Sequence, residues 1–98
     1  MLRINKLPLA EEGLIDIWIY GYETWGVAQA DTYADSIEDT LNALARMPKK
    51  YPMRTDLRPP VRICHHISHL IIYTIAEDER AITVIRVLHK SMDIEQHL

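Results

Sequence analysis

Residues 27–48 read VAQADTYADSIEDTLNALARMP, and this stretch decides the fold. Its apolar residues recur at alternating spacings of three and four, which is the period of one face of an α-helix. The members of this seam are Val27, Ala30, Ala34, Ile37, Leu41 and Leu44, widened by Tyr33 and Ala45. Pro48 ends the helix, because proline cannot continue the helical hydrogen bonding. A helix with one long apolar face has to be buried against a second layer of structure.

The residues before this stretch predict a strand and a first helix. Residues 2–7 alternate between apolar and polar, which is typical of a half-buried strand, and Pro8 ends the alternation. A helix is expected over residues 9–23, since proline is well placed in a first helical turn. Its core-facing residues are expected to be Leu14, Ile15, Trp18 and Tyr22. Only a short break at Gly26 separates the two helices, which predicts an antiparallel hairpin.

The residues after the second helix follow the period of strands. Residues 70–75 are almost all apolar and rich in β-branched side chains, as in a central strand that is covered on both faces. Apolar and polar residues alternate in the strand before it, and a polar turn precedes the last strand. This order predicts an antiparallel meander. The strands are expected at residues 61–68, 70–75 and 81–88, after at most an edge strand before Pro59-Pro60. Residues 90–98 are expected to form a short helical tail.

This order of elements predicts the fold class. It is an α+β fold with an N-terminal strand, an antiparallel helical hairpin packed on a small curved, mostly antiparallel sheet, and a short C-terminal helix. The sequence holds no repeat, linker or low-complexity segment. Residues 1–98 are therefore expected to form a single domain.

The composition restricts the classes of function. The 98 residues include 11 Lys or Arg and 14 Asp or Glu, a net charge of −3, whereas proteins that grip nucleic-acid backbones are usually basic. The lone Cys64 leaves no internal disulfide and fits a reducing cytoplasm. No apolar run is long enough to span a membrane, and the N-terminus has no signal-peptide pattern. We expect a cytoplasmic protein without direct nucleic-acid or membrane binding.

Residues spread over nearly the whole chain resemble one known family. They are Ala10, residues 14–17, Tyr22, Trp25-Gly26, Gln29-Ala30, Tyr33, Leu44, Pro48, Arg62, His69, Ile72-Tyr73, residues 82–89 and Met92-Asp93. In this order they are similar to the ParE branch of the ParE/RelE toxin superfamily. One departure is the loop Lys49-Lys50-Tyr51-Pro52, where many relatives have a glycine. The resemblance implies a type II toxin that inhibits DNA gyrase by binding and is neutralised by a ParD-like antitoxin.

Several histidines and arginines raise the alternative of catalysis. RelE-type relatives are ribosome-dependent messenger RNA endonucleases, and such chemistry needs a base, an acid and cations at the phosphate. Arg62, Arg86 and His89, with Tyr73 nearby, could in principle be brought together for it. The acidic net charge argues against a ribosome-binding nuclease, so we predict a non-enzyme. The residues predicted to contact the target instead are Arg62, Arg86, His89, Met92 and Asp93. An inert relative that only binds its partner is a third possibility.

Two further site predictions follow. The antitoxin is expected to lay an apolar segment on the hairpin, with Trp18, Tyr22, Trp25, Tyr33 and Ile37 as interface candidates, although core packing is the simpler reading of Trp18. The histidines near residue 66 could suggest a metal site. On one continuous strand only His65 and His69 would share a face, so we expect no metal and no cofactor.

Overall fold

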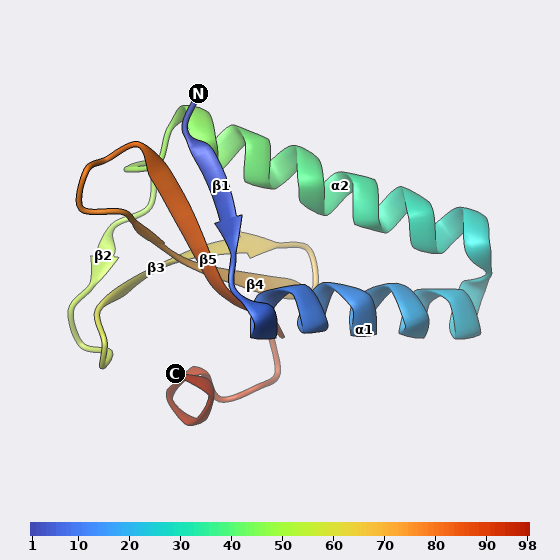
Figure 1. Ribbon diagram of the computed structural model, residues 1–98. Coiled ribbons are helices and arrows are strands. Elements are labelled where there is room, and N and C mark those ends of the chain that lie inside the picture. Colours follow the sequence, from blue (N-terminus) through green and yellow to red (C-terminus); the bar gives the residue numbers. More distant parts are fainter.

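The protein is described by a computed structural model that covers residues 1–98. A five-stranded sheet has the spatial order β1-β5-β4-β3-β2 (Figure 1). The strands are β1 (Arg3–Lys6), β2 (Met53–Arg54), β3 (Val61–His66), β4 (His69–Ile75) and β5 (Ala81–His89). Only β1 and β5 are parallel; the other pairs are antiparallel. The predicted α+β fold, its meander and its central strand β4 are confirmed.

The two helices form the predicted hairpin. Helix α1 (Pro8–Trp25) and helix α2 (Val27–Arg46) are joined by Gly26 alone, whose φ of +95° lies in a region that L side chains rarely adopt. Figure 1 shows the hairpin on one side of the sheet, with its tip extending beyond the strands. Neither helix is long and apolar enough to cross a membrane.

The sheet is buried on both faces by different means. The face under the hairpin packs against α2 through Ile37, Leu41 and Leu44, which come from the seam that the sequence predicted. On the opposite face Leu57, from the loop after β2, joins apolar residues of β3, β4 and β5. The C-terminal tail covers this second layer with Ile94 and Leu98. The tail contains a one-turn 3-10 helix (Ile94–His97), shorter than the helix expected over residues 90–98.

The predicted core face of α1 is wrong in part. Ile15 is 58 % exposed and Tyr22 is 51 % exposed, whereas Ala10 is fully buried and Gly21 is also buried. The helix turns its small residues inward because it lies close to the sheet and to α2. The clearest case is Gly13, where an added Cβ would lie 2.8 Å from the carbonyl oxygen of Val87 in β5. Because small residues occupy the inner face of α1, the aromatic residues Trp18 and Tyr22 lie outside the core clusters.

The predicted single strand over residues 61–68 is also wrong. Ile67 and Ser68 form a two-residue turn between β3 and β4, and His66 pairs with His69 across it. Residues that pair across two strands share a face, so His66 and His69 lie together while His65 points to the other side. The sequence-based pairing of His65 with His69 fails because the chain reverses between them.

The glycines at positions 13 and 21 of α1 provide a matched test of this packing. At Gly21 an added Cβ would meet Ala30 at 3.4 Å, an ordinary contact, so Gly21→Ala should gain up to roughly 1 kcal/mol of helix propensity. Gly13→Ala gains the same propensity but forces α1 away from a backbone oxygen. We expect the free energy of unfolding of Gly13→Ala to lie about 1–3 kcal/mol below that of Gly21→Ala in chemical denaturation. Equal stabilities would show that α1 does not rest on β5 at this point.

Candidate functional site

A groove of about 730 Å³ lies beneath the overhanging tip of the hairpin. Its walls come from α1, the start of α2, the β3–β4 turn, the end of β5 and the C-terminal tail. The apolar side chains in it that are also exposed are Tyr20, Trp25, Ile67 and Met92. Large exposed apolar side chains gathered in one concave place indicate a binding surface.

The groove lies beside an open stretch of sheet edge. Strand β1 pairs with β5 only from Ala81 to Val84, so the outer edge of β5 has no strand partner from Ile85 onward. Helix α1 covers this edge at Val87, where Gly13 allows the close approach. The remaining end of β5 faces the groove through Leu88 and His89. The site therefore combines an apolar wall with the end of an incompletely paired strand.

A polar network forms the wall between α2 and the β3–β4 turn. The hydroxyl of Tyr33 lies 2.7 Å from Nδ1 of His69. The ring of His66 lies between two hydroxyls of α2, with Nε2 at 2.9 Å from Ser36 Oγ and Nδ1 at 2.8 Å from Thr40 Oγ1. These contacts connect the turn to α2 and hold one side of the groove in place.

Burial keeps these histidines neutral. The pKa of His69 is lowered to about 4, mainly by burial and further by the nearby His89 and His66. Burial also lowers the pKa of His66 and raises the pKa of the Tyr33 hydroxyl. Neutral His69 can accept a hydrogen bond at Nδ1 from the hydroxyl of Tyr33. The ring of His89 meets that of His69 edge-on, with centroids 5.4 Å apart.

The structure separates the two arginines predicted to contact the target. Arg62 pairs with Tyr73 on the hairpin side of the sheet and donates a hydrogen bond to the carbonyl oxygen of Tyr51. Arg86 pairs with Ile72, on the side covered by the tail, and its guanidinium donates to the carbonyl oxygen of His97 at 3.3 Å. A catalytic cluster of Arg62, Arg86 and His89 is not assembled, because the sheet lies between the two guanidinium groups.

The other predicted target residues lie close together at the end of β5. His89 is exposed, and its Nδ1 lies 2.7 Å from the hydroxyl of Ser91. Met92 is exposed and lines the groove. Asp93 caps the 3-10 helix by accepting a hydrogen bond from the backbone N–H of Glu95 at 3.1 Å. Of this set, Arg86, His89 and Met92 line the groove.

The predicted antitoxin residues divide into three groups. Trp25 and Tyr33 line the groove. Trp18 and Tyr22 stack on each other outside it, and the indole N–H of Trp18 donates to Asp31 of α2 at 2.8 Å, so Trp18 belongs to neither core cluster. Ile37 is a correction: it is 1 % exposed in the main core, so its side chain is not available to a partner.

Two exposed apolar residues of the groove were missed by the sequence-based predictions. Tyr20 lies between the predicted core positions of α1, and nothing in its spacing distinguished it. Ile67 was assigned to the interior of a strand, although it occupies a turn with a φ of +51° and is 71 % exposed. The adjacent turn residue Ser68 was the only local signal for a chain reversal there.

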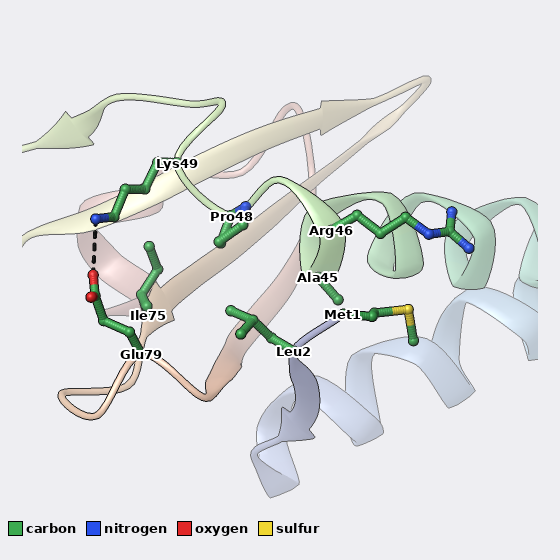
Figure 2. A pocket seen from close by; sticks show the side chains of 8 residues that line it. All are labelled: Met1, Leu2, Ala45, Arg46, Pro48, Lys49, Ile75 and Glu79. Atoms are coloured by element: carbon green, nitrogen blue, oxygen red, sulfur yellow. Dashed lines mark ion pairs between the residues drawn. The ribbon is translucent and has the colours of Figure 1, made fainter.

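A second, smaller hollow lies at the opposite end of α2. Figure 2 shows Leu2, Ala45, Pro48 and Ile75 around it, with Lys49 and Glu79 paired at 2.9 Å on one side. Its volume is about 300 Å³. None of the residues predicted to bind a partner lies here. No group of three or more His, Cys, Asp or Glu side chains is placed to hold a metal ion anywhere in the structure.

Comparison with solved structures places the arrangement in a known class. The chain matches a structure titled as the chromosomal ParDE TA system from P. aeruginosa with a TM-score of 0.75. The match covers 91 % of this chain and 96 % of that chain at 15 % identity, which shows a shared fold. The hairpin on a five-stranded sheet is therefore a fold that this chain shares with a chain of that system.

Sequence comparison establishes the family. The family model described as the ParE toxin of the type II toxin–antitoxin system parDE matches residues 4–94. Toxin ParE1 of Caulobacter vibrioides is 36 % identical over 89 residues, covering 91 % of this chain and 90 % of the relative. Toxin ParE1 of Mycobacterium tuberculosis is 33 % identical over 91 residues, covering 93 % and 92 %. This chain belongs to the ParE toxin family of type II toxin–antitoxin systems.

The neutral state of His69 predicts an acid-sensitive fold. The unfolded chain takes up a proton near pH 6.5, whereas folded His69 resists protonation down to about pH 4. Its contribution to stability is complete above about pH 6.5 and is lost as the pH falls towards 4. Denaturant titrations between these values should show a steeper loss of stability for the native chain than for His69→Gln.

The matched control for this titration is His65→Gln. His65 is exposed on the other side of the sheet and lies outside the polar network. The control should therefore keep the pH dependence of the native chain. If stability fell with pH equally in the native chain and in His69→Gln, the lowered pKa of His69 would be contradicted.

Proposed function

We propose that this toxin inhibits DNA gyrase by binding, without catalysis, and that a ParD-like antitoxin neutralises it by occupying the groove. The observation that carries the proposal is the exposed apolar groove beside the end of β5. The target contacts that we infer, His89 and Met92, lie in the same groove. A segment bound there covers them, so one surface accounts for both toxicity and its neutralisation. This proposal includes a cytoplasmic location, where the target resides.

The groove suits an apolar segment of a partner chain. Tyr20 and Trp25 meet edge-on with ring centroids 5.7 Å apart, which forms an aromatic wall with Trp25 64 % exposed. Aromatic side chains of this kind are frequent anchors of interfaces. The unpaired end of β5 also offers a place for a short extended segment. Family membership supports an antitoxin of the ParD kind as the occupant, since the matched solved structure is titled a ParDE system.

Ile67 supports a binding role for the groove through its backbone. A φ of +51° is unfavourable for an L residue, and especially for a β-branched one, by about 1–2 kcal/mol. The side chain gains little from packing in return, since it is largely exposed. A strained, exposed apolar residue in a groove is best explained by a contact with a partner.

The proposal of a non-catalytic mode rests on the positions of Arg62 and Arg86, whose side chains lie on opposite faces of the sheet. Stabilising a phosphate during cleavage requires cationic groups directed at one point. Arg62 supports the loop at Tyr51, and Arg86 holds the tail on the other face of the sheet. The net charge of −3 also opposes binding to ribosomal RNA.

The target is tested with purified components. The toxin added to gyrase and plasmid DNA should inhibit supercoiling and increase double-strand cleavage, while a reconstituted translation reaction proceeds with intact messenger RNA. Preincubation with the antitoxin should restore supercoiling. Cleaved messenger RNA on ribosomes with unaffected gyrase would establish the nuclease alternative, and no effect in either assay would indicate an inert relative.

Ile67→Asn tests the groove by separating stability from binding. Asparagine tolerates a positive φ, so the variant should be more stable to thermal unfolding by about 1 kcal/mol. It also removes an exposed apolar contact, so its affinity for the antitoxin should fall by about tenfold in isothermal calorimetry. Ile15→Ser, outside the groove, is the control and should bind as the native toxin does. A variant that binds normally would contradict the proposal.

A further inference from the structure

Positive charge is concentrated in one short segment of this toxin. Residues 46–62, from the end of α2 into β3, contain six of the eleven Lys or Arg residues and one of the fourteen Asp or Glu residues. We call residues 46–62 the basic segment. Figure 1 shows the loop after α2 and strand β2 at the end of the molecule opposite the hairpin tip. None of these residues lines the groove.

The basic segment already holds two carboxylates of its own chain. Arg54 donates two hydrogen bonds to Asp56, from Nε to Oδ1 at 2.9 Å and from Nη2 to Oδ2 at 2.8 Å. Lys49 forms an ion pair with Glu79 of the β4–β5 turn at 2.9 Å. The exposed cations of the segment that form no ion pair are Arg46, Lys50 and Arg58. The segment therefore has the chemistry to bind carboxylates and retains unpaired cations for more of them.

Buried groups hold the basic segment in place. Tyr73 is fully buried, and its hydroxyl donates to the carbonyl oxygen of Pro48 at 2.9 Å. Arg62 donates to the carbonyl oxygen of Tyr51, and Leu57 is packed in the second core layer. Four of the five prolines of the chain lie in this segment and restrict its backbone. A partner that binds a segment fixed in this way has little conformational entropy to remove.

The unpaired cations lie on both sides of an edge strand. Strand β2 is the outermost strand of the sheet, so it has a strand partner on one side only. Lys50 lies three residues before β2 and Arg58 lies four residues after it. Met53 of β2 is itself 43 % exposed. An extended chain lying along β2 can therefore meet cations at both of its ends.

We infer that the basic segment is a second docking site, for an extended segment of a protein partner that is rich in Asp and Glu. Its carboxylates meet Lys50 and Arg58 and replace Asp56 at Arg54. The partner is distinct from the antitoxin, a point that rests on the proposed place of the antitoxin in the groove. Nucleic acid is disfavoured, because residues 7–45 include eight Asp or Glu and no Lys or Arg and repel a long polyanion.

The test uses the full-length toxin and a fluorescent peptide of about 12 residues in which glutamate alternates with threonine, long enough to extend from Lys50 to Arg58. Fluorescence anisotropy at about 0.05 M salt should detect binding, and the affinity should fall by about tenfold at about 0.3 M because exposed ion pairs are screened. A peptide with glutamine in place of glutamate should not bind. Absence of binding by the glutamate peptide, or equal binding of the two peptides, would overturn the inference.

A matched pair of double variants locates the peptide. Lys50→Gln/Arg58→Gln should weaken binding by about tenfold or more, and both changes are at exposed positions without an ion pair. Arg3→Gln/Lys90→Gln removes the same charge at exposed positions, on β1 at the opposite edge of the sheet and after β5. This control should change the affinity by less than about twofold. Equal losses in the two variants would overturn the inference, because the peptide would then respond only to overall charge.

Asp56→Asn tests whether Arg54 belongs to the site. The variant removes the internal carboxylate and frees the guanidinium, so the affinity for the acidic peptide should rise by about threefold. Asp35→Asn, an exposed position on α2, removes the same charge outside the basic segment and is the control. No gain in Asp56→Asn, or an equal gain in both variants, would contradict the place of Arg54 in the site.

Two further measurements identify the occupant. Toxin saturated with its antitoxin should bind the peptide within about twofold of the free toxin, since the sites are separate. Complete competition would overturn the inference of a separate partner, whereas the supercoiling assay tests the proposed function independently of this result. A DNA duplex of about 20 base pairs should not bind at the same salt. Duplex binding that Lys50→Gln/Arg58→Gln abolishes, without binding of the acidic peptide, would overturn the inference in favour of nucleic acid.

Discussion

The contact between helix α1 and the edge of β5 is the constraint on which the rest of this structure depends. Strand β1 ends at Lys6 and Pro8 begins the helix, so α1 takes over the β5 edge where β1 stops. Gly13 lets the helix backbone reach the carbonyl oxygen of Val87. The position of α1 in turn places α2 on the sheet and the hairpin tip beyond it. The groove exists because the hairpin is longer than the sheet that supports it.

The two covered faces of the sheet explain why Arg62 and Arg86 do not form one site. Alternation along the strands sends Arg62 towards the hairpin and Arg86 towards the tail. Each guanidinium then holds a backbone carbonyl, of Tyr51 in one case and of His97 in the other. Both arginines support segments that cross a face of the sheet. This arrangement favours a toxin that works through its surface.

Periodicity predicted most of the fold, and it failed where a local exception decides the geometry. The seam of α2 and the central strand around Ile72 were found because burial imposes a regular spacing. The inward face of α1 was found only in part, at Leu14, since Gly13 and Gly21 carry no hydrophobic signal and their role depends on neighbours distant in sequence. The groove was found in part through Trp25, Tyr33 and Met92. Ile67 was missed because its positive φ contradicts the usual preference of a β-branched residue.

A single surface, the groove, is proposed both to hold the antitoxin and to contain the target contacts. Hydrogen exchange of the toxin, alone and with its antitoxin, tests this directly, because it reports protection segment by segment along the backbone. We predict protection concentrated at residues 67–69 and 86–92 and at the hairpin tip around Trp25. Protection confined to the smaller hollow between Leu2 and Ile75, with the groove segments unchanged, would contradict a shared surface.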